Sequence, residues 1–210
     1  MCRCSLSVVT QTTAGVTDKE KVENLKNHFN SGSFLESFEH LLDFSTFHID
    51  WCDEQESKTC SSNVTDLENV RIFTNRFKEI SHFQSSKQPS GQKCFVVLGF
   101  KMFLDGGQDY FLSNWKELSG LGNLLLFLST KNYLVGQVML LQNIEPVNLV
   151  RDMFNHMVLV EVFYSKDMLI YLLDYVQRTR DGRNTGHVSV YHEIEIEKNV
   201  NGNEKLGFSI

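Results

Sequence analysis

The sequence has few prolines, few tryptophans and no long hydrophobic run. It contains 2 Pro and 2 Trp in 210 residues, and its longest apolar region, residues 121–141, is interrupted by Lys131, Asn132 and Gln137. A transmembrane helix needs about 20 consecutive apolar residues, so no membrane span is expected. The N-terminal apolar run is also far shorter than the core of a secretory signal. We therefore expect an intracellular protein, either cytoplasmic or nuclear.

Paired cysteines and an excess of basic charge are absent as well. The odd number and irregular spacing of the cysteines argue against a disulfide framework; they are Cys2, Cys4, Cys52, Cys60 and Cys94. The formal net charge is −6, whereas attraction to phosphates normally needs a basic face. Nucleic-acid binding is therefore only the third hypothesis for function.

The common catalytic motifs do not occur. The sequence contains no G-x-S-x-G, no H-E-x-x-H and no G-x-x-x-x-G-K-[ST]. The segment from His48 to Cys60 supplies metal-binding residue types, but it lacks the two close pairs that a structural zinc site shows. We therefore expect no catalytic residues, no metal and no cofactor, and the sequence favours a protein that is not an enzyme.

The composition is that of an ordered chain. Hydrophobic residues make up 41% of it, charged residues 22%, and Phe alone accounts for 16 positions. Composition and patterning predict a flexible N-terminus over 1–16, a helical region over 17–83, a linker over 84–93 and an α/β domain over 94–210.

Apolar side chains in the region 17–83 recur at intervals of three and four residues, which is typical of helices. The pattern predicts one helix capped by Thr17 or Asp18, a second capped by Ser33, and a third over residues 66–83.

Beyond residue 93 the pattern alternates between strands and helices. It predicts strands over 94–104 and 157–164, each followed by a helix, and a short helix over 146–156. The run 123–141 fits a buried strand followed by a helix, although a single long helix through the run has a similar periodicity. Alternating elements of this kind predict a partly parallel sheet with helices laid against it, so the expected fold class is mixed α/β.

The last 24 residues, 187–210, alternate apolar and polar side chains and predict a C-terminal β-hairpin. The buried face is expected to hold Val188, Val190, Ile194 and Ile196, with His192 at its edge. The opposite face is expected to meet water; it carries His187, Ser189, Tyr191, Glu193, Glu195 and Glu197.

Two clusters are candidates for binding or catalysis. Arg178, Arg180 and Arg183 lie within six residues and form a candidate anion-binding group. Asp105 opens an Asp-Gly-Gly turn at the end of a predicted strand, and Asp109 lies in the first turn of the helix that follows, where substrates bind in many α/β sheets. Together these residues define the alternative hypothesis, an enzyme that acts on phosphoesters or transfers a group, although a structural turn and a solvated helix end account for them equally well.

The segment 33–57 has the most unusual composition. It contains seven acids and no Lys or Arg, interleaved with aromatic residues. Acidic flanks around aromatic anchors are typical of segments that bind a groove on another protein, so the candidate partner-binding residues are Phe34, Phe38, Phe47 and Trp51. The alternative is that these rings pack in the protein's own core. The leading functional hypothesis is thus a non-enzymatic interaction module, a subunit or adaptor of an intracellular complex, whose protein partner presents a basic groove.

Overall fold

The computed structural model describes residues 3–11, 32–38, 46–52, 63–67, 70–86, 90–101, 107–144, 154–181 and 186–194. Nine strands of these residues belong to one sheet. The strands are β1 Arg3–Gln11, β2 Ser33–Ser37, β3 Thr46–Cys52, β4 Asn63–Leu67, β5 Val70–Gln84, β6 Gln92–Phe100, β7 Leu134–Asn143, β8 His156–Tyr164 and β9 His187–Ile194. The helices are α2 Gly107–Leu118, α3 Leu121–Thr130, the short 3₁₀ helix η2 Lys166–Met168 and α4 Leu169–Asp181.

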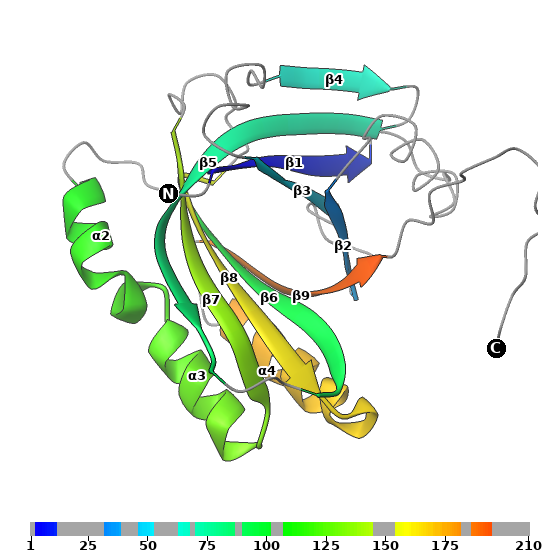
Figure 1. The fold of residues 1–210 in the computed structure, drawn as a ribbon, viewed down its shortest axis with the longest axis vertical. Coiled ribbons are helices and arrows are strands. Elements are labelled where there is room, and N and C mark those ends of the chain that lie inside the picture. Colours follow the sequence, from blue (N-terminus) through cyan, green and yellow to red (C-terminus); the bar gives the residue numbers. More distant parts are fainter. Residues whose placement is uncertain are drawn as a thin grey trace, which may run out of the picture.

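The sheet closes on itself. Its order is β1-β3-β2-β9-β6-β8-β7-β5-β4, and β1 also pairs with β5, so all the strands except β4 form a ring. We call this ring the barrel. The long strand β5 makes closure possible, because residues 70–78 pair with β1 and residues 77–84 pair with β7. Figure 1 shows β5 bending between these two neighbours.

The barrel consists of two halves with the same strand order. In the second half, β9-β6-β8-β7 places the fourth, first, third and second strands of the chain side by side, and β5-β1-β3-β2 repeats that order in the first half. This is the arrangement of a split β-α-β unit. The halves meet where β2 pairs with β9 and where β5 pairs with β7.

The described helices cover the outer surface of the second half (Figure 1). Each helix turns an apolar stripe toward the sheet. The buried side chains are Phe111 and Trp115 on α2, Leu121, Leu124 and Leu128 on α3, and Leu172 and Val176 on α4. Arg180 links α4 to β9 by hydrogen bonds: its guanidinium donates two of them to the Val188 carbonyl, at 3.0 and 2.8 Å.

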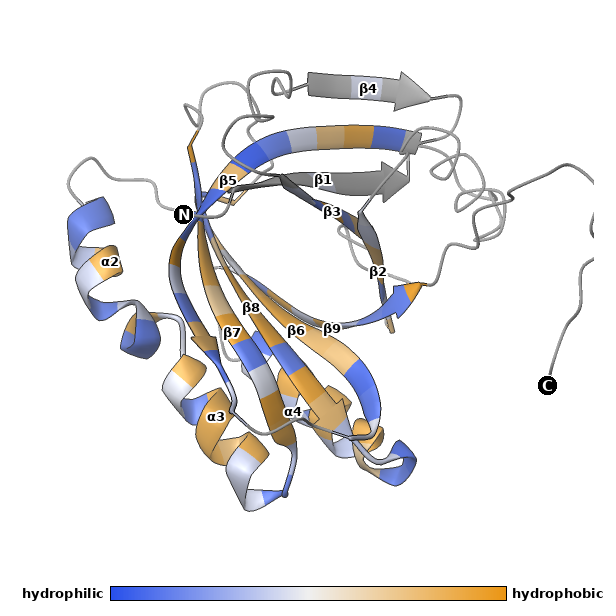
Figure 2. Ribbon diagram, in the orientation of Figure 1, coloured by the Kyte–Doolittle hydropathy of each residue, from blue (hydrophilic) through white to orange (hydrophobic). Residues whose placement is uncertain are grey.

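Two hydrophobic cores lie on the two faces of the strands. The outer core contains residues of the helices together with alternate residues of β6 to β9, such as Val96, Val158 and Val188. The inner core contains strand residues of both halves and none of the helices, for example Phe47, Phe77 and Phe95. The inner core therefore fills the barrel, as side chains do in eight-stranded barrels. Figure 2 shows hydrophobic residues along β6, β7 and β8, the strands that are covered on both faces.

The predicted partly parallel sheet is wrong, because every strand pair found is antiparallel. β6 and β7, joined through α2 and α3, run in the same direction, since each is antiparallel to β8. However, β8 lies between them and pairs with both. The chain alternates as predicted, but successive strands across a helix are not neighbours in the sheet.

The predicted helical N-terminal region is also wrong where the structure describes it. β1 lies within the stretch 1–16 that was predicted to be flexible. The helix expected after Ser33 is β2, and most of the helix expected over 66–83 is β5. The helix capped by Thr17 or Asp18 lies outside the described residues. The predicted linker 84–93 overlaps the end of β5 and the start of β6, at the junction of the two halves.

In the second half most elements agree with the prediction, namely β6, α2, β8, α4 and β9. The run 123–141 has the reverse order, since the helix α3 precedes the strand β7. The short helix over 146–156 and the second strand of the hairpin lie mostly or wholly outside the described residues. None of the helices in the described ranges is long and apolar enough to cross a membrane.

The polar face predicted for β9 is not a solvent face. Val188 and Val190 are buried as expected, but Ser189 and Tyr191 on the other side are also buried, and Glu193 is half-buried. The reason is barrel closure, which turns this second face toward the interior. Ile196, Glu195 and Glu197 lie beyond the described residues.

Candidate functional site

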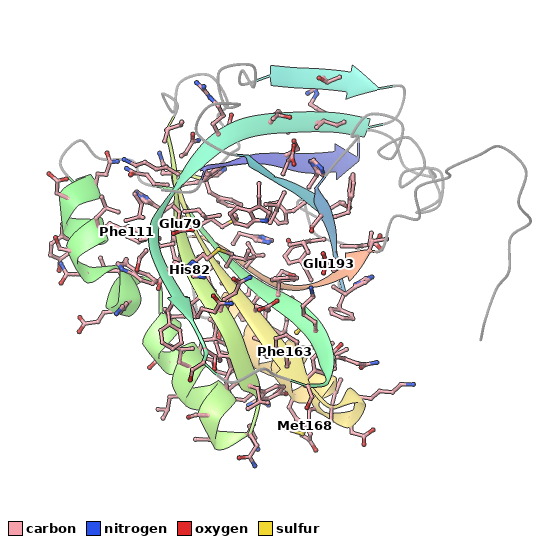
Figure 3. All side chains as sticks on the ribbon, in the orientation of Figure 1. Glu79, His82, Phe111, Phe163, Met168 and Glu193 are labelled. Carbon is pink, nitrogen blue, oxygen red and sulfur yellow. The ribbon has the colours of Figure 1, made fainter. Side chains whose placement is uncertain are left out.

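Three ionisable side chains converge at one end of the barrel interior. Glu161 on β8 and Tyr191 on β9 both lie opposite Phe95 of β6. Lys93 and Glu193 each stand one two-residue step further along β6 and β9, so they share the face of Phe95 and Tyr191, which belong to the inner core. We call Lys93, Glu161 and Glu193 the barrel-end cluster. Figure 3 labels Glu193 at this end of β9.

Lys93 and Glu193 form the paired part of the cluster. The Lys93 ammonium makes a salt bridge to Glu193 and lies 5.4 Å from the centroid of the Phe95 ring. Burial acts to raise the pKa of Glu193, but hydrogen bonds from Lys93 and Ser33 outweigh it and hold that pKa below its ordinary value. Glu193 is therefore a carboxylate whose negative charge is already balanced by Lys93.

Glu161 is the member of the cluster whose carboxyl lacks a hydrogen-bond donor in the described residues. Burial raises the pKa of its carboxyl, Lys93 opposes that shift, and the neighbouring Glu193 charge adds to it. Within the part of the chain that the structure describes, no group donates a hydrogen bond to this carboxyl. A half-buried acid without a donor is costly to keep ionised, and such groups gather at functional sites.

Gly136 makes room for the Glu161 carboxyl. A methyl group at Gly136 would overlap the Glu161 carboxyl and the Phe163 ring. The pairing of β7 with β8 shifts register between Val135 and Val138, so Gly136 lies in a bulge, a feature often found beside functional sites. The Glu161 carboxyl and the Phe163 ring thus both lie against the backbone of Gly136, where no side chain intervenes.

Trp51 lies at the same end of the barrel. Neighbouring strands of the ring are antiparallel, so the last residues of β3 and β9 and the first residues of β6 share one end. Trp51 is the penultimate residue of β3, on the same face as Phe47 of the inner core, and is 41% exposed. An accessible indole therefore accompanies the barrel-end cluster.

A second polar group lies deeper in the barrel. The His187 ring nitrogen Nε2 is 2.7 Å from the Tyr191 hydroxyl, and the Phe154 ring stacks on the imidazole. Burial, assisted by the positive charge of Arg180, lowers the pKa of His187 to about 3. His187 is therefore neutral at physiological pH and holds Tyr191 in the interior.

The four predicted partner-binding residues lie in different environments. Phe34 and Phe47 are buried in the protein itself, Phe38 is half-buried with its ring 4.9 Å from the His192 ring, and Trp51 is exposed. His192 lies at the edge of the core, as expected, 3.7 Å from the Glu36 carboxylate. Of the four rings, Trp51 has the largest accessible surface.

Two arginines of the predicted enzymatic site make contacts within the protein. Arg178 forms an exposed ion pair with Asp174 at 3.0 Å, and Arg180 binds the Val188 carbonyl. Asp109 is exposed in the first turn of α2. Asp105 and Arg183 lie outside the described residues, so the enzymatic hypothesis remains an untested prediction. The described ranges contain no group of three or more His, Cys, Asp or Glu residues that fits a metal ion.

A family model described as "Domain of unknown function (DUF7153)" matches residues 29–193, which span most of both halves of the barrel. The chain belongs to this family. The match covers every member of the barrel-end cluster, so the cluster is part of the DUF7153 domain. No curated protein matches the chain.

Among solved structures, the chain is similar to the heme-degrading enzyme from Listeria monocytogenes. The identity is 10%, and the alignment covers 89% of this chain and 98% of that chain with a TM-score of 0.32. A likeness at this level carries no conclusion about the DUF7153 protein.

Sequence reasoning missed the barrel-end cluster. Its signal is Glu161, the single acid inside the apolar run "MVLVEVFY". In a strand covered on both faces, a lone charge marks an inward position near an end of the barrel. Gly136 is a second signal, because a glycine inside a strand often marks a bulge.

Proposed function

We propose that the protein binds a small organic cation or amine at the end of the barrel. The observation that carries this proposal is the Glu161 carboxyl, which is half-buried, has a raised pKa and receives no hydrogen bond from the described residues. A cationic ligand supplies the positive charge and the donor that this carboxyl lacks.

The surroundings of Glu161 support a cation over an anion or a neutral ligand. The cluster has two carboxylates and one ammonium, so its formal charge is 1 − 2 = −1 when Glu161 is ionised. Phe163 adjoins the same bulge and Trp51 is accessible at the same end. Aromatic faces beside a carboxylate are a common setting for amines, because the ring quadrupole attracts a cation.

Isothermal titration calorimetry with choline and n-butylamine tests the proposal, with sodium chloride at equal ionic strength as the reference. We expect saturable binding of at least one of the two cations. Glu161→Gln should weaken that binding by about tenfold or more, equivalent to about 1.4 kcal/mol.

Glu117→Gln is the matched control, because Glu117 is an exposed acid on α2 and its replacement changes the net charge equally. Equal affinities of the wild type and Glu161→Gln, or no saturable heat with either cation, contradict the proposal.

The exposed Trp51 favours a second function, binding of another protein, as expected for an interaction module. A large accessible aromatic ring is typical of interface anchors. In this alternative, Trp51→Ala abolishes stoichiometric co-purification of a partner, whereas Phe83→Ala, which removes another exposed ring, does not. If the wild type brings no stoichiometric partner, the alternative is wrong.

A further inference from the structure

Three polar residues form a row across adjacent strands on the outer face of the sheet. Lys78 on β5 lies opposite Gln142 on β7, and Gln142 lies opposite His156 on β8. Residues directly opposite each other share a face, and their Cβ atoms are about 4.5–5.5 Å apart. We call Lys78, Gln142 and His156 the polar row. It lies away from the barrel interior, since the neighbouring residues Met139, Leu141 and Met157 point inward.

Two members of the polar row are buried without partners. His156 is 1% exposed and Gln142 is 5% exposed. Neither ring nitrogen of His156, nor Oε1 of Gln142, has a hydrogen-bond partner in the described part of the chain. An unpaired buried polar atom is costly to a fold, so three of them in one row indicate a function.

Aromatic rings cover one end of the row. The Phe111 ring of α2 lies 4.6 Å from the His156 ring and 5.4 Å from the Phe100 ring. Figure 3 labels Phe111 where α2 faces the sheet. Lys78, at the other end, is only half-buried. The row therefore runs from solvent at Lys78 to an apolar wall at Phe111.

We propose that the polar row is a binding site for a small carboxylate. The ammonium of Lys78 neutralises the charge, while an imidazole N–H of His156 and the amide NH₂ of Gln142 donate hydrogen bonds to the carboxylate oxygens. The Gln142 amide presents its NH₂ to the ligand after a half-turn about its last bond, a change that exchanges oxygen and nitrogen without moving the backbone.

The charges around the row fit this ligand. Lys78 gives the row a formal charge of +1, and none of its three residues is acidic. Glu79, the next residue on β5, points to the opposite face because its pairing partner Leu141 belongs to the inner core. Asp109 on α2 is exposed to solvent. Burial, with a contribution from Lys78, lowers the pKa of His156 to about 4, so the imidazole is neutral and donates one N–H. The other hydrogen bonds to the carboxylate come from Lys78 and Gln142.

The test is an NMR titration of the histidine imidazoles in labelled full-length protein with sodium acetate, using sodium chloride as the reference. The His156 signals are assigned by their loss in His156→Phe. We expect acetate, but not chloride, to shift the His156 signals to saturation. Lys78→Met should weaken the response by about tenfold or more, the size expected for losing a charged hydrogen bond.

Lys116→Met provides the matched control, because it removes an exposed lysine of α2 outside the row. Gln142→Met keeps the side-chain volume and removes only the amide. Weakened binding in this variant is therefore attributed to the lost hydrogen bond and not to misfolding. The proposal is overturned if acetate does not shift the His156 signals beyond the effect of chloride, or if Lys78→Met and Gln142→Met respond like the wild type. The outcome is independent of cation binding at the barrel end.

Discussion

At the scale of residues, Gly136 leaves the space in which the Glu161 carboxyl lies. The carboxyl of Glu161 occupies the space that a side chain at position 136 would fill. A glycine inside a strand weakens the strand by lost packing and entropy, so its presence in the bulge of β7 is best explained by the room it leaves.

We predict that Gly136→Ala destabilises folding by about 1–3 kcal/mol and abolishes cation binding, because the added methyl displaces the Glu161 carboxyl and the Phe163 ring. The change is measured by urea denaturation and calorimetry.

Gly122→Ala is the matched control for this substitution. Gly122 lies exposed in α3 with open space at its Cβ position, so alanine there should stabilise the protein by about 0.5–1 kcal/mol. Equal effects of the two substitutions contradict the assigned role of Gly136.

Buried neutral histidines predict a loss of stability in acid. Burial lowers the pKa of His156 to about 4, from an ordinary value near 6.5. Above pH 6.5 the imidazole is neutral in both the folded and the unfolded protein. Below it only the unfolded chain takes up the proton, so the free energy of unfolding falls by up to about 1.4 kcal/mol per pH unit until about pH 4.

Urea denaturation of the wild type and of His156→Phe across this pH range tests the prediction. The difference between the two proteins should change between pH 6.5 and 4 and then level off. The phenylalanine variant retains the ring beside Phe111 and lacks the titrating group. A difference that is independent of pH means that His156 titrates normally.

At the scale of elements, one arginine adds hydrogen bonds to the apolar contact of α4 with β9. Arg180 donates two hydrogen bonds to the Val188 carbonyl, whereas Arg178, two residues earlier, pairs with the exposed Asp174. The predicted anion-binding group therefore contains one residue that joins elements and one on the surface.

We predict that Arg180→Met lowers the free energy of unfolding by about 1–3 kcal/mol, because it removes charged hydrogen bonds to a half-buried carbonyl. Arg178→Met should change it by about 0.5 kcal/mol or less, the usual value of an exposed pair. Denaturation curves of the two variants decide this, and similar losses in both indicate that Arg180 does not hold α4 on β9.

The elements predicted wrongly share a physical cause. Phe73 and Phe77 of β5 are four residues apart, a spacing that places side chains on one face of a helix and equally on one face of a strand. Phe77 lies in the inner core and Ile80 packs with the outer core, so apolar residues three apart occupy opposite faces of β5, a spacing that also fits a helix. The β-bulge between Glu79 and Ser81 then interrupts the period of two. The β-branched Val70, Ile72 and Thr74 were the available signal for a strand.

The strand β2 was not recognisable from the sequence for a related reason. Phe34 and Leu35 face opposite sides and both are buried, so the strand shows no alternation. Elements with a plain signal, such as the apolar run of β8 and the amphipathic α4, were predicted correctly. The sequence marks Glu161 but not its companions in the barrel-end cluster, because Lys93, Glu161 and Glu193 meet only through the pairing of β6 with β8 and β9.

At the scale of the whole molecule, barrel closure makes the two halves one folding unit. The inner core combines Phe47 and Phe77 of the first half with Phe95 and Met157 of the second. Neither half alone covers these side chains, so we expect both halves to unfold in a single transition.

The two tryptophans report on the two halves separately, Trp51 on the first and Trp115 on the second. In Trp115→Phe the fluorescence of Trp51, and in Trp51→Phe the fluorescence of Trp115, should follow the same urea curve as the circular dichroism of that variant. A Trp51 transition at a clearly lower urea concentration would show that the first half unfolds independently.

The most direct test of the central claim is a titration of the Glu161 side-chain carboxyl by ¹³C NMR in the presence and absence of the organic cation that binds. In the free protein the pKa of Glu161 should lie above that of an ordinary glutamate, because of burial and the neighbouring Glu193 charge. A bound cation favours the ionised form, so the pKa should fall on addition of ligand. A normal pKa that the cation leaves unchanged would contradict a binding site at Glu161.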